Sequence, residues 1–108
     1  MKIYPKYEDY QINFQQIYQI LKEILPNLKQ QYQVKSLGIF GSYVRGEATE
    51  NSDLDLLVEF EYNLTFDNYM NLKFFLEDLF NKKIDLVIKE DLKPQISQFI
   101  LEETVNVS

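Results

Sequence analysis

The sequence lacks two residue types that dominate enzyme chemistry, cysteine and histidine. Without cysteine among its 108 residues, the chain cannot form disulfides, thiol nucleophiles or cysteine-based metal clusters. Without histidine, it has neither the usual general base near neutral pH nor the commonest ligand of transition metals. Any metal site must therefore use oxygen ligands, which suit hard ions such as Mg²⁺ or Mn²⁺.

Long apolar runs and an excess of positive charge are also missing. No stretch approaches the roughly 18 residues that cross a bilayer, and the N-terminus lacks a signal-peptide pattern. We therefore expect a cytoplasmic protein with no membrane partner. The formal net charge of −6 disfavours broad nucleic-acid binding, because that binding needs clustered Lys and Arg.

Glycine and arginine are scarce, and they fall together. The chain has three glycines, Gly38, Gly41 and Gly46, and its sole arginine, Arg45, lies among them. Backbone freedom is therefore concentrated where a loop must turn sharply or approach a ligand closely.

The remaining composition suits one packed domain. Apolar residues make up 45% of the chain, which is enough for a core, and the length predicts a single domain over residues 1–108. We divide it into an N-terminal helical segment, 1–33, and a core, 34–108, that carries the candidate site.

Hydrophobic patterning predicts an α+β fold, with a short mixed sheet of three strands flanked by helices. Buried strands are expected over residues 34–40, 53–60 and 83–88. Between the first two strands, the polar, glycine-bearing segment 41–52 is expected to be a loop with one helical turn after Ser42.

The helices are expected from apolar residues spaced three and four apart. The first spans about residues 8–25, and Pro26 predicts a break before a short second helix that ends near Tyr32. A further helix follows Thr65 as N-cap and is terminated by Asn81. The last helix begins near Lys93, with Pro94 in its first turn and with Ile96, Phe99 or Ile100, and Glu103 along it.

Three aspartates are candidate catalytic residues and metal ligands. Asp53 and Asp55 fall on one face of a strand, because strand side chains alternate with period two. Two such carboxylates repel each other unless a cation intervenes. Asp85 interrupts an otherwise apolar strand, which is unfavourable unless something positive faces it.

Together with the Gly-Ser turn, these acids point to nucleotidyl transfer. Mg²⁺ held by carboxylates keeps positions open for phosphate oxygens, and two ions can activate the attacking oxygen and stabilise the leaving group. Gly41 and Ser42 would cradle the β- and γ-phosphates, where a Cβ at residue 41 would crowd the ligand. Arg45 is a third candidate for nucleotide binding.

Each of these residues also has a structural alternative. Asp53 and Asp55 could protect a strand edge from aggregation, and Asp85 could pair with Lys82 or Lys83. The two lysines could be solvated or could clamp a triphosphate. The turn residues have similar alternatives. Gly41 could simply form a turn, and Ser42 could be an N-cap. Arg45 could pair with Glu47 or Glu50, and Ser52 could cap or orient the loop.

The pattern IFGSYVRGEATENSDLDLLVEF over residues 39–60, followed by IDLV at 84–87, resembles a known family. It is similar to the minimal nucleotidyltransferases (MNT) of the DNA polymerase β-like superfamily, and more narrowly to the MNT antitoxins of HEPN–MNT toxin–antitoxin pairs. The resemblance runs from about Val34 to the C-terminus and includes the final V-x-V.

The resemblance implies a nucleotidyltransferase-like fold and an Mg²⁺-dependent protein adenylyltransferase, with one or two ions and Mn²⁺ as a substitute. Such an enzyme moves AMP from ATP to a tyrosine of its HEPN ribonuclease partner, with which it forms a hetero-oligomer. Carried over by residue, Gly41 and Ser42 take the triphosphate, while Asp53, Asp55 and Asp85 take the metals.

The small size of the chain favours a macromolecular acceptor, because no length remains for a separate substrate domain. A tyrosine phenol, with a pKa of about 10, ionises more easily than a serine hydroxyl and could lose its proton to metal-bound hydroxide or to a carboxylate such as Asp85. A non-catalytic antitoxin that masks the toxin by binding is the alternative, motivated by the many aromatic residues. Transfer to a small molecule is a third hypothesis.

Overall fold

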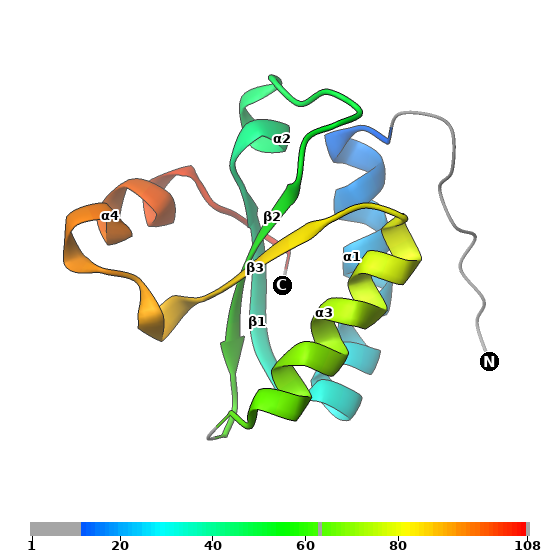
Figure 1. Cartoon of the computed structure of the whole chain (residues 1–108), viewed down its shortest axis with the longest axis vertical. Coiled ribbons are helices and arrows are strands. Elements are labelled where there is room, and N and C mark those ends of the chain that lie inside the picture. The colour runs from blue at the N-terminus through cyan, green and yellow to red at the C-terminus, as the bar shows by residue number, and fades with distance from the viewer. Residues whose placement is uncertain (1–11, 63, 108) are drawn as a thin grey trace.

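The computed structural model describes residues 12–62 and 64–107, which form a mixed four-stranded sheet with helices on both faces (Figure 1). The strand order is β3-β2-β1-β4, in which β1 runs antiparallel to β2 and β4, and β2 runs parallel to β3. The α+β class and the short mixed sheet are thus confirmed. In chain order the elements are α1 (Phe14–Tyr32), β1 (Val34–Phe40), α2 (Ser42–Arg45), β2 (Leu54–Phe60), α3 (Phe66–Phe80), β3 (Ile84–Ile88), the 3₁₀ turn η1 (Lys89–Asp91), α4 (Pro94–Glu103) and β4 (Val105–Asn106).

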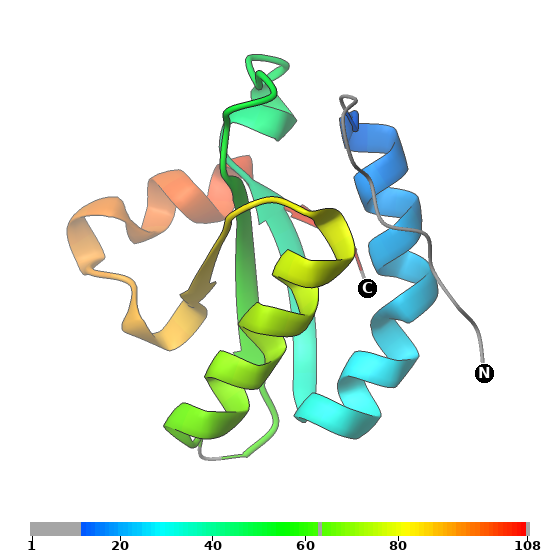
Figure 2. The same cartoon turned by 45° about the vertical axis from the view of Figure 1, so that its right-hand side comes forward.

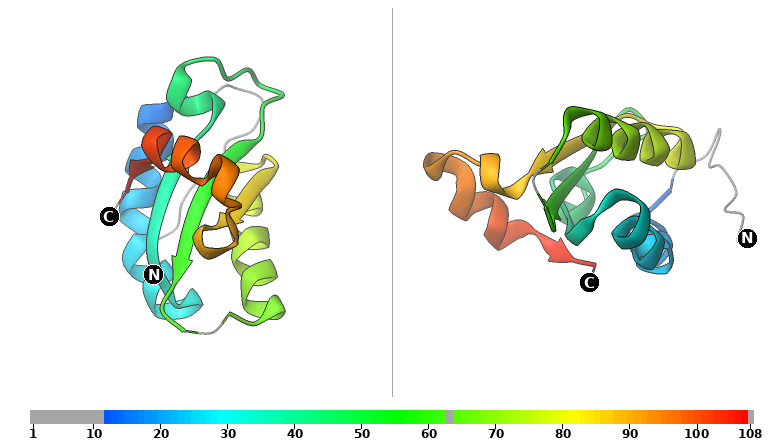
Figure 3. Two further views of the ribbon diagram at one scale, coloured as in Figure 1. Left: turned by 90° about the vertical axis from the view of Figure 1, so that its left-hand side faces the viewer. Right: turned by 90° about the horizontal axis from the view of Figure 1, so that it is seen from below.

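The helices form two unequal layers. Helices α1 and α3 pack on one face of the sheet, while α4 crosses the other face (Figures 2 and 3). Leu54, Leu56 and Val58 of β2 are fully buried in the core under α1 and α3. Because strand side chains alternate, Asp55 and Leu57 point to the face that carries α4. Within the described part of the chain, no helix combines the length and the apolar character needed to cross a bilayer.

Helix α1 runs without a break through Pro26, so the expected interruption is wrong. Proline removes the hydrogen bond that its N–H would give to the carbonyl of Lys22, four residues earlier. Both residues are exposed, so the unpaired carbonyl lies on the solvent side of α1, where water can reach it, and the buried stripe of α1 remains intact. The helix begins after Asn13, which forms a capping box with Gln16, and part of the expected start, residues 8–11, lies outside the described residues.

The strands and the loop between them largely follow the sequence prediction. The bounds of β1 and the helical turn after Ser42 are confirmed, whereas β2 and β3 each begin one residue later than expected. Helix α3 is also confirmed: the Thr65 hydroxyl accepts the N–H of Asn68 at 3.1 Å, and Asn81 closes the helix in the left-handed conformation, with φ 49°.

The fourth strand, β4, was not expected, and the prediction of three strands is wrong in this respect. Gly38 and Ile39 of β1 pair with Asn106 and Val105, and the Val107 N–H donates to the Leu37 carbonyl at 2.9 Å. Gly38 permits this approach, because a Cβ there would overlap the Thr104 methyl group. The strand brings the end of α4 against the end of β1, where the candidate site lies.

Candidate functional site

Two of the three predicted carboxylates meet at one end of the sheet. Asp55 of β2 and Asp85 of β3 are register partners on neighbouring parallel strands. Buried Leu54 and Leu56 flank the first aspartate, and buried residues also flank the second, so both carboxylates lie on the α4 face of the sheet. Asp55 is half-buried and Asp85 is exposed.

The pKa of Asp55 is raised from 3.8 to about 6. Burial is the main cause, followed by the negative charge of Asp85, a hydrogen bond shared with Asp85 and the charge of Asp53, while Arg45 acts in the opposite direction. The ionised form of Asp55 beside Asp85 is therefore energetically unfavourable in the folded protein. Oxygen donors that repel one another fit the ligand preference of a hard divalent cation.

Asp53 lies immediately before β2 and is exposed, and it contributes to the pair as a nearby negative charge. Among residues 12–62 and 64–107, no three acidic side chains are arranged as a metal site. Asp85 thus acts on Asp55 through its charge and a hydrogen bond, whereas Asp53 acts through its charge alone, and the assignment of all three as metal ligands stays a prediction.

Gly41 forms the turn between β1 and α2, in contact with Asp55. Its φ of 81° lies in the region that L side chains rarely adopt, and a Cβ at this position would overlap the Asp55 carboxylate. Glycine is therefore required here because a Cβ would collide with Asp55 of the same chain. From the sequence, the expected collision was with a bound phosphate. The carbonyl of Gly41 accepts the N–H groups of Val44 and Arg45, at 3.1 and 3.2 Å.

Ser42 is the first residue of α2, and Gly41 takes the N-cap position without a side-chain bond. The alternative that Ser42 serves as an N-cap is therefore wrong. The loop that follows is held at its far end: the Ser52 hydroxyl accepts the Thr49 N–H at 2.8 Å, as the loop-orienting alternative for Ser52 expected.

Lys82, which lies between α3 and β3, holds the same loop. Its ammonium donates to the carbonyls of Ser52 at 2.9 Å and Glu50 at 3.4 Å, and it lies 5.5 Å from the centre of the Tyr43 ring. This role, an anchor for the loop before Asp53, is neither of the two that the sequence suggested. The Lys82 ammonium thus faces the loop carbonyls, whereas the register partner of Asp85 is Asp55.

Arg45 is bound by two carboxylates from distant parts of the chain. Its Nε donates to Glu47 at 2.8 Å, which confirms one of the expected pairings, and its Nη1 donates to both oxygens of Glu103 at 2.9 and 3.0 Å. Hydrogen bonds to Glu47 first, and then to Glu103, raise the pKa of Arg45. Glu103 also accepts the N–H of Gly41, a role that sequence reasoning missed because the two residues are 62 positions apart.

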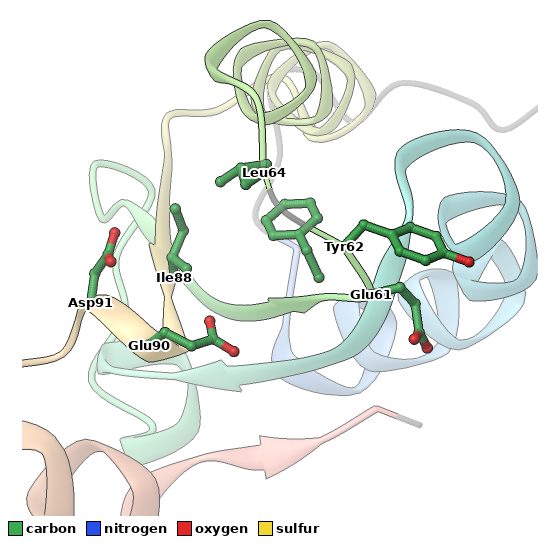
Figure 4. Close-up of a pocket in the computed structure, with 7 residues that line it drawn as sticks. Glu61, Tyr62, Leu64, Ile88, Glu90 and Asp91 are labelled. Carbon is green, nitrogen blue, oxygen red and sulfur yellow. The ribbon is translucent and has the colours of Figure 1, made fainter.

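A separate hollow of about 910 Å³ lies at the opposite ends of β2 and β3 (Figure 4). Its lining combines apolar side chains with three carboxylates, which would repel a triphosphate. The Gly41 turn and the Asp55–Asp85 pair lie at the other end of these strands, where the glycine backbone is in contact with the Asp55 carboxylate. The lining residues of the hollow are Phe60, Glu61, Tyr62, Leu64, Ile88, Glu90 and Asp91.

The chain matches a known family model over most of its length. Residues 21–107 match the family model described as the nucleotidyltransferase domain. The chain belongs to this nucleotidyltransferase family. The match covers the Gly41 turn, all three aspartates and Glu103, and it includes most of α1.

Individual relatives of this nucleotidyltransferase extend the comparison. A Thermococcus cleftensis protein named protein adenylyltransferase MntA is 40% identical over 96 residues, which cover 89% of this chain and 97% of that protein. A solved structure described as a candidate minimal nucleotidyltransferase is 33% identical, with a TM-score of 0.75, and the alignment covers 88% of this chain and 96% of the other.

A solved complex of tri-AMPylated Shewanella oneidensis HEPN toxin with MNT antitoxin contains a chain of the same fold. The TM-score is 0.62 at 17% identity, over 84% of this chain and 71% of the other. At that identity the likeness concerns the fold.

Proposed function

We propose that this nucleotidyltransferase transfers AMP from ATP to a tyrosine of a partner HEPN toxin and thereby neutralises it. The observation that carries the proposal is the Asp55–Asp85 pair directly beside the Gly41 turn. The name of the Thermococcus relative, a protein adenylyltransferase, supports the reaction class. The fold shared with a complex of an AMPylated HEPN toxin supports the kind of partner.

The triphosphate would bind at the Gly41–Arg45 turn. Gly41 adds no side chain to the turn, Ser42 offers a half-exposed hydroxyl, and Arg45 is exposed and keeps its positive charge at any physiological pH while it is paired with Glu47 and Glu103. These three residues therefore combine small size, a hydrogen-bond donor and positive charge, which is what a polyphosphate requires.

Asp53, Asp55 and Asp85 would hold Mg²⁺, with Mn²⁺ as a substitute. The raised pKa of Asp55 supports this role, because two adjacent carboxylates offer the oxygen donors and the charge that a hard cation needs. When bound, the ion supplies positive charge to the phosphate oxygens and to the attacking oxygen. The carboxylates themselves orient the site and give it a fixed position at the end of β2 and β3.

The proposed reaction is an in-line displacement at the α-phosphorus. The phenolic oxygen of the acceptor tyrosine forms a new bond to this phosphorus, the bond to the bridging oxygen of the β-phosphate breaks, and pyrophosphate leaves. The phenolic proton passes to a carboxylate at the site, such as Asp85, and from there to water. Because Asp85 is exposed on the α4 face, an acceptor carried by another protein can reach it.

The direct test incubates the purified protein with Mg²⁺, α-labelled ATP and lysate of the host cell, followed by separation of the proteins. A discrete labelled band that disappears with Asp53→Asn and Asp55→Asn is expected, and mass spectrometry of that band identifies the modified tyrosine. Label found only in nucleic acid or in small molecules would overturn the proposed acceptor. Normal transfer by either variant would overturn the metal assignment.

A second candidate function is masking of the toxin by binding alone. The most exposed aromatic side chains of the described residues favour it: Tyr62, Phe66 and Phe99, with 72%, 75% and 68% of their surface accessible. Stoichiometry separates the two functions, because a masking protein must match the toxin one to one. Neutralisation at a small fraction of the toxin concentration, dependent on ATP, is expected for the enzyme alone.

A further inference from the structure

The carboxylate of Glu103 joins two groups of the candidate nucleotide turn. It accepts the backbone N–H of Gly41, and its two oxygens accept the Arg45 guanidinium at 2.9 and 3.0 Å. Only 13% of the Glu103 side chain is exposed, whereas 45% of the Arg45 side chain is exposed. A carboxylate that is largely covered and satisfied by charge-assisted hydrogen bonds holds its partners in a fixed geometry.

This contact depends on the end of α4, which belongs to a different part of the chain from the turn. Glu103 is the last residue of α4, and the Thr104 hydroxyl and N–H both donate to the Ile100 carbonyl, which fixes that end. Strand β4 follows at once and pairs with β1 through Gly38 and Ile39. The position of Glu103 is therefore set by backbone pairing with the same strand that ends at the turn.

Glu103 also influences the position of Asp55, because Gly41 contacts both residues. A Cβ on Gly41 would overlap the Asp55 carboxylate, so Gly41 and Asp55 are in direct contact. Asp55 in turn is the register partner of Asp85. A shift of Gly41 would thus displace both the phosphate-binding backbone and the aspartate beside it.

We propose that Glu103 is a positioning residue for nucleotide binding: it fixes Gly41 and Arg45 before ATP arrives. This inference rests on the proposed function and adds the residue that orders its nucleotide turn. Without Glu103, the turn and the arginine must be ordered by the nucleotide itself, and this ordering weakens binding. Once ATP is bound, its phosphates supply that order, so the rate of transfer from the bound state changes little.

The test compares Glu103→Ala, Glu103→Gln and the control Glu102→Ala in ATP binding and in transfer kinetics. Glu102 lies next to Glu103 on α4, but it is exposed, and within the described part of the chain its carboxylate accepts from Gln98 at 3.1 Å. Glu103→Ala is expected to raise the KM for ATP at least about tenfold, with kcat changed by less than about threefold. Glu103→Gln keeps an oxygen for the Gly41 N–H and is expected to restore KM to within about threefold of the wild type.

A second readout follows the turn without nucleotide. Because the chain has three glycines, protein labelled with ¹⁵N-glycine gives three backbone amide signals, one of them from Gly41. Hydrogen exchange of the Gly41 amide is expected to accelerate at least about tenfold in Glu103→Ala and less in Glu103→Gln. Circular dichroism confirms that each variant remains folded.

Two results would overturn the inference: a wild-type KM in folded Glu103→Ala, or a lower KM, which would make the carboxylate a competitor of the phosphates. If the wild type itself binds no ATP and transfers no AMP, the proposed function fails as well. If the wild type is active and the variants match it, only the role of Glu103 fails.

Discussion

The α-carbon of Gly41 lies against the carboxylate of Asp55, with no room for a side chain between the turn and the strand. The turn proposed to bind phosphate and the aspartate proposed to bind metal are therefore one packed unit. Their separation is set by van der Waals contact and not by loop flexibility.

Gly41→Ala tests this contact, with Gly46→Ala as a matched control. Both glycines have positive φ, 81° and 74°, but a Cβ on Gly46 meets nothing within 4 Å. Gly46→Ala is expected to lower the free energy of unfolding by about 1 kcal/mol from backbone strain alone. Gly41→Ala adds overpacking and is expected to lower it by about 3 kcal/mol. Urea denaturation measures both, and equal effects would contradict the contact with Asp55.

The contribution of Asp55 to the stability of the protein is expected to fall as the pH rises from about 4 to about 6. The pKa of Asp55 is raised from 3.8 to about 6, so the folded state binds more protons than the unfolded state in this window. Because Asp55 is only half-buried, the expected loss is on the order of 1 kcal/mol. The difference between wild type and Asp55→Asn in chemical denaturation across this range isolates the contribution, and a difference independent of pH would contradict it.

Asp85→Asn is expected to lower the pKa of Asp55 without restoring it to 3.8. The variant removes the charge of Asp85, which is the second cause of the shift, while burial, the first cause, remains. The carboxyl ¹³C signal of Asp55, followed through a pH titration, measures this directly. A pKa unchanged from about 6 would show that the two carboxylates do not interact.

Mg²⁺ and ATP together are expected to raise the melting temperature. A ligand present at one hundred times its Kd stabilises the folded state by about 2.7 kcal/mol. Asp55→Asn should abolish this shift, whereas Asp67→Asn, an exposed acid in the first turn of α3, should preserve it. Chelation of the metal with EDTA supplies the second control, and an equal shift with EDTA would exclude a metal-dependent nucleotide site.

Lys82→Ala is expected to loosen the loop before Asp53, while Lys83→Ala is not. Lys82 donates to the carbonyls of Ser52 and Glu50, and the loss of this charged donor should cost about 1 kcal/mol of stability. Lys83 is exposed and adjacent, which makes it the matched control. Hydrogen exchange of residues 49–52 measures the local effect, and equal protection in both variants would contradict the anchoring role.

Much of the fold follows from short stretches of sequence. The apolar run over residues 34–40 predicts β1, and Thr65 and Asn81 mark the ends of α3, because caps and hydrophobic periods act within a few residues. The same local reasoning fails at Pro26, where it predicts a helix break that the structure does not have. A local rule treats proline as a helix breaker, but the exposed side of α1 accommodates it while the opposite side packs on the sheet.

The candidate site divides in the same way. The sequence by itself singled out the residues that are proposed to carry the chemistry, because Gly41, Ser42, Asp53 and Asp55 form a recognisable pattern over a short span and Asp85 interrupts an apolar strand. Only the tertiary structure decided that Asp55 and Asp85 share a register position, that β4 pairs with β1, and that Glu103 holds the turn. These contacts join residues far apart in the chain, and the packing of the whole sheet fixes them, so no local pattern could reveal them.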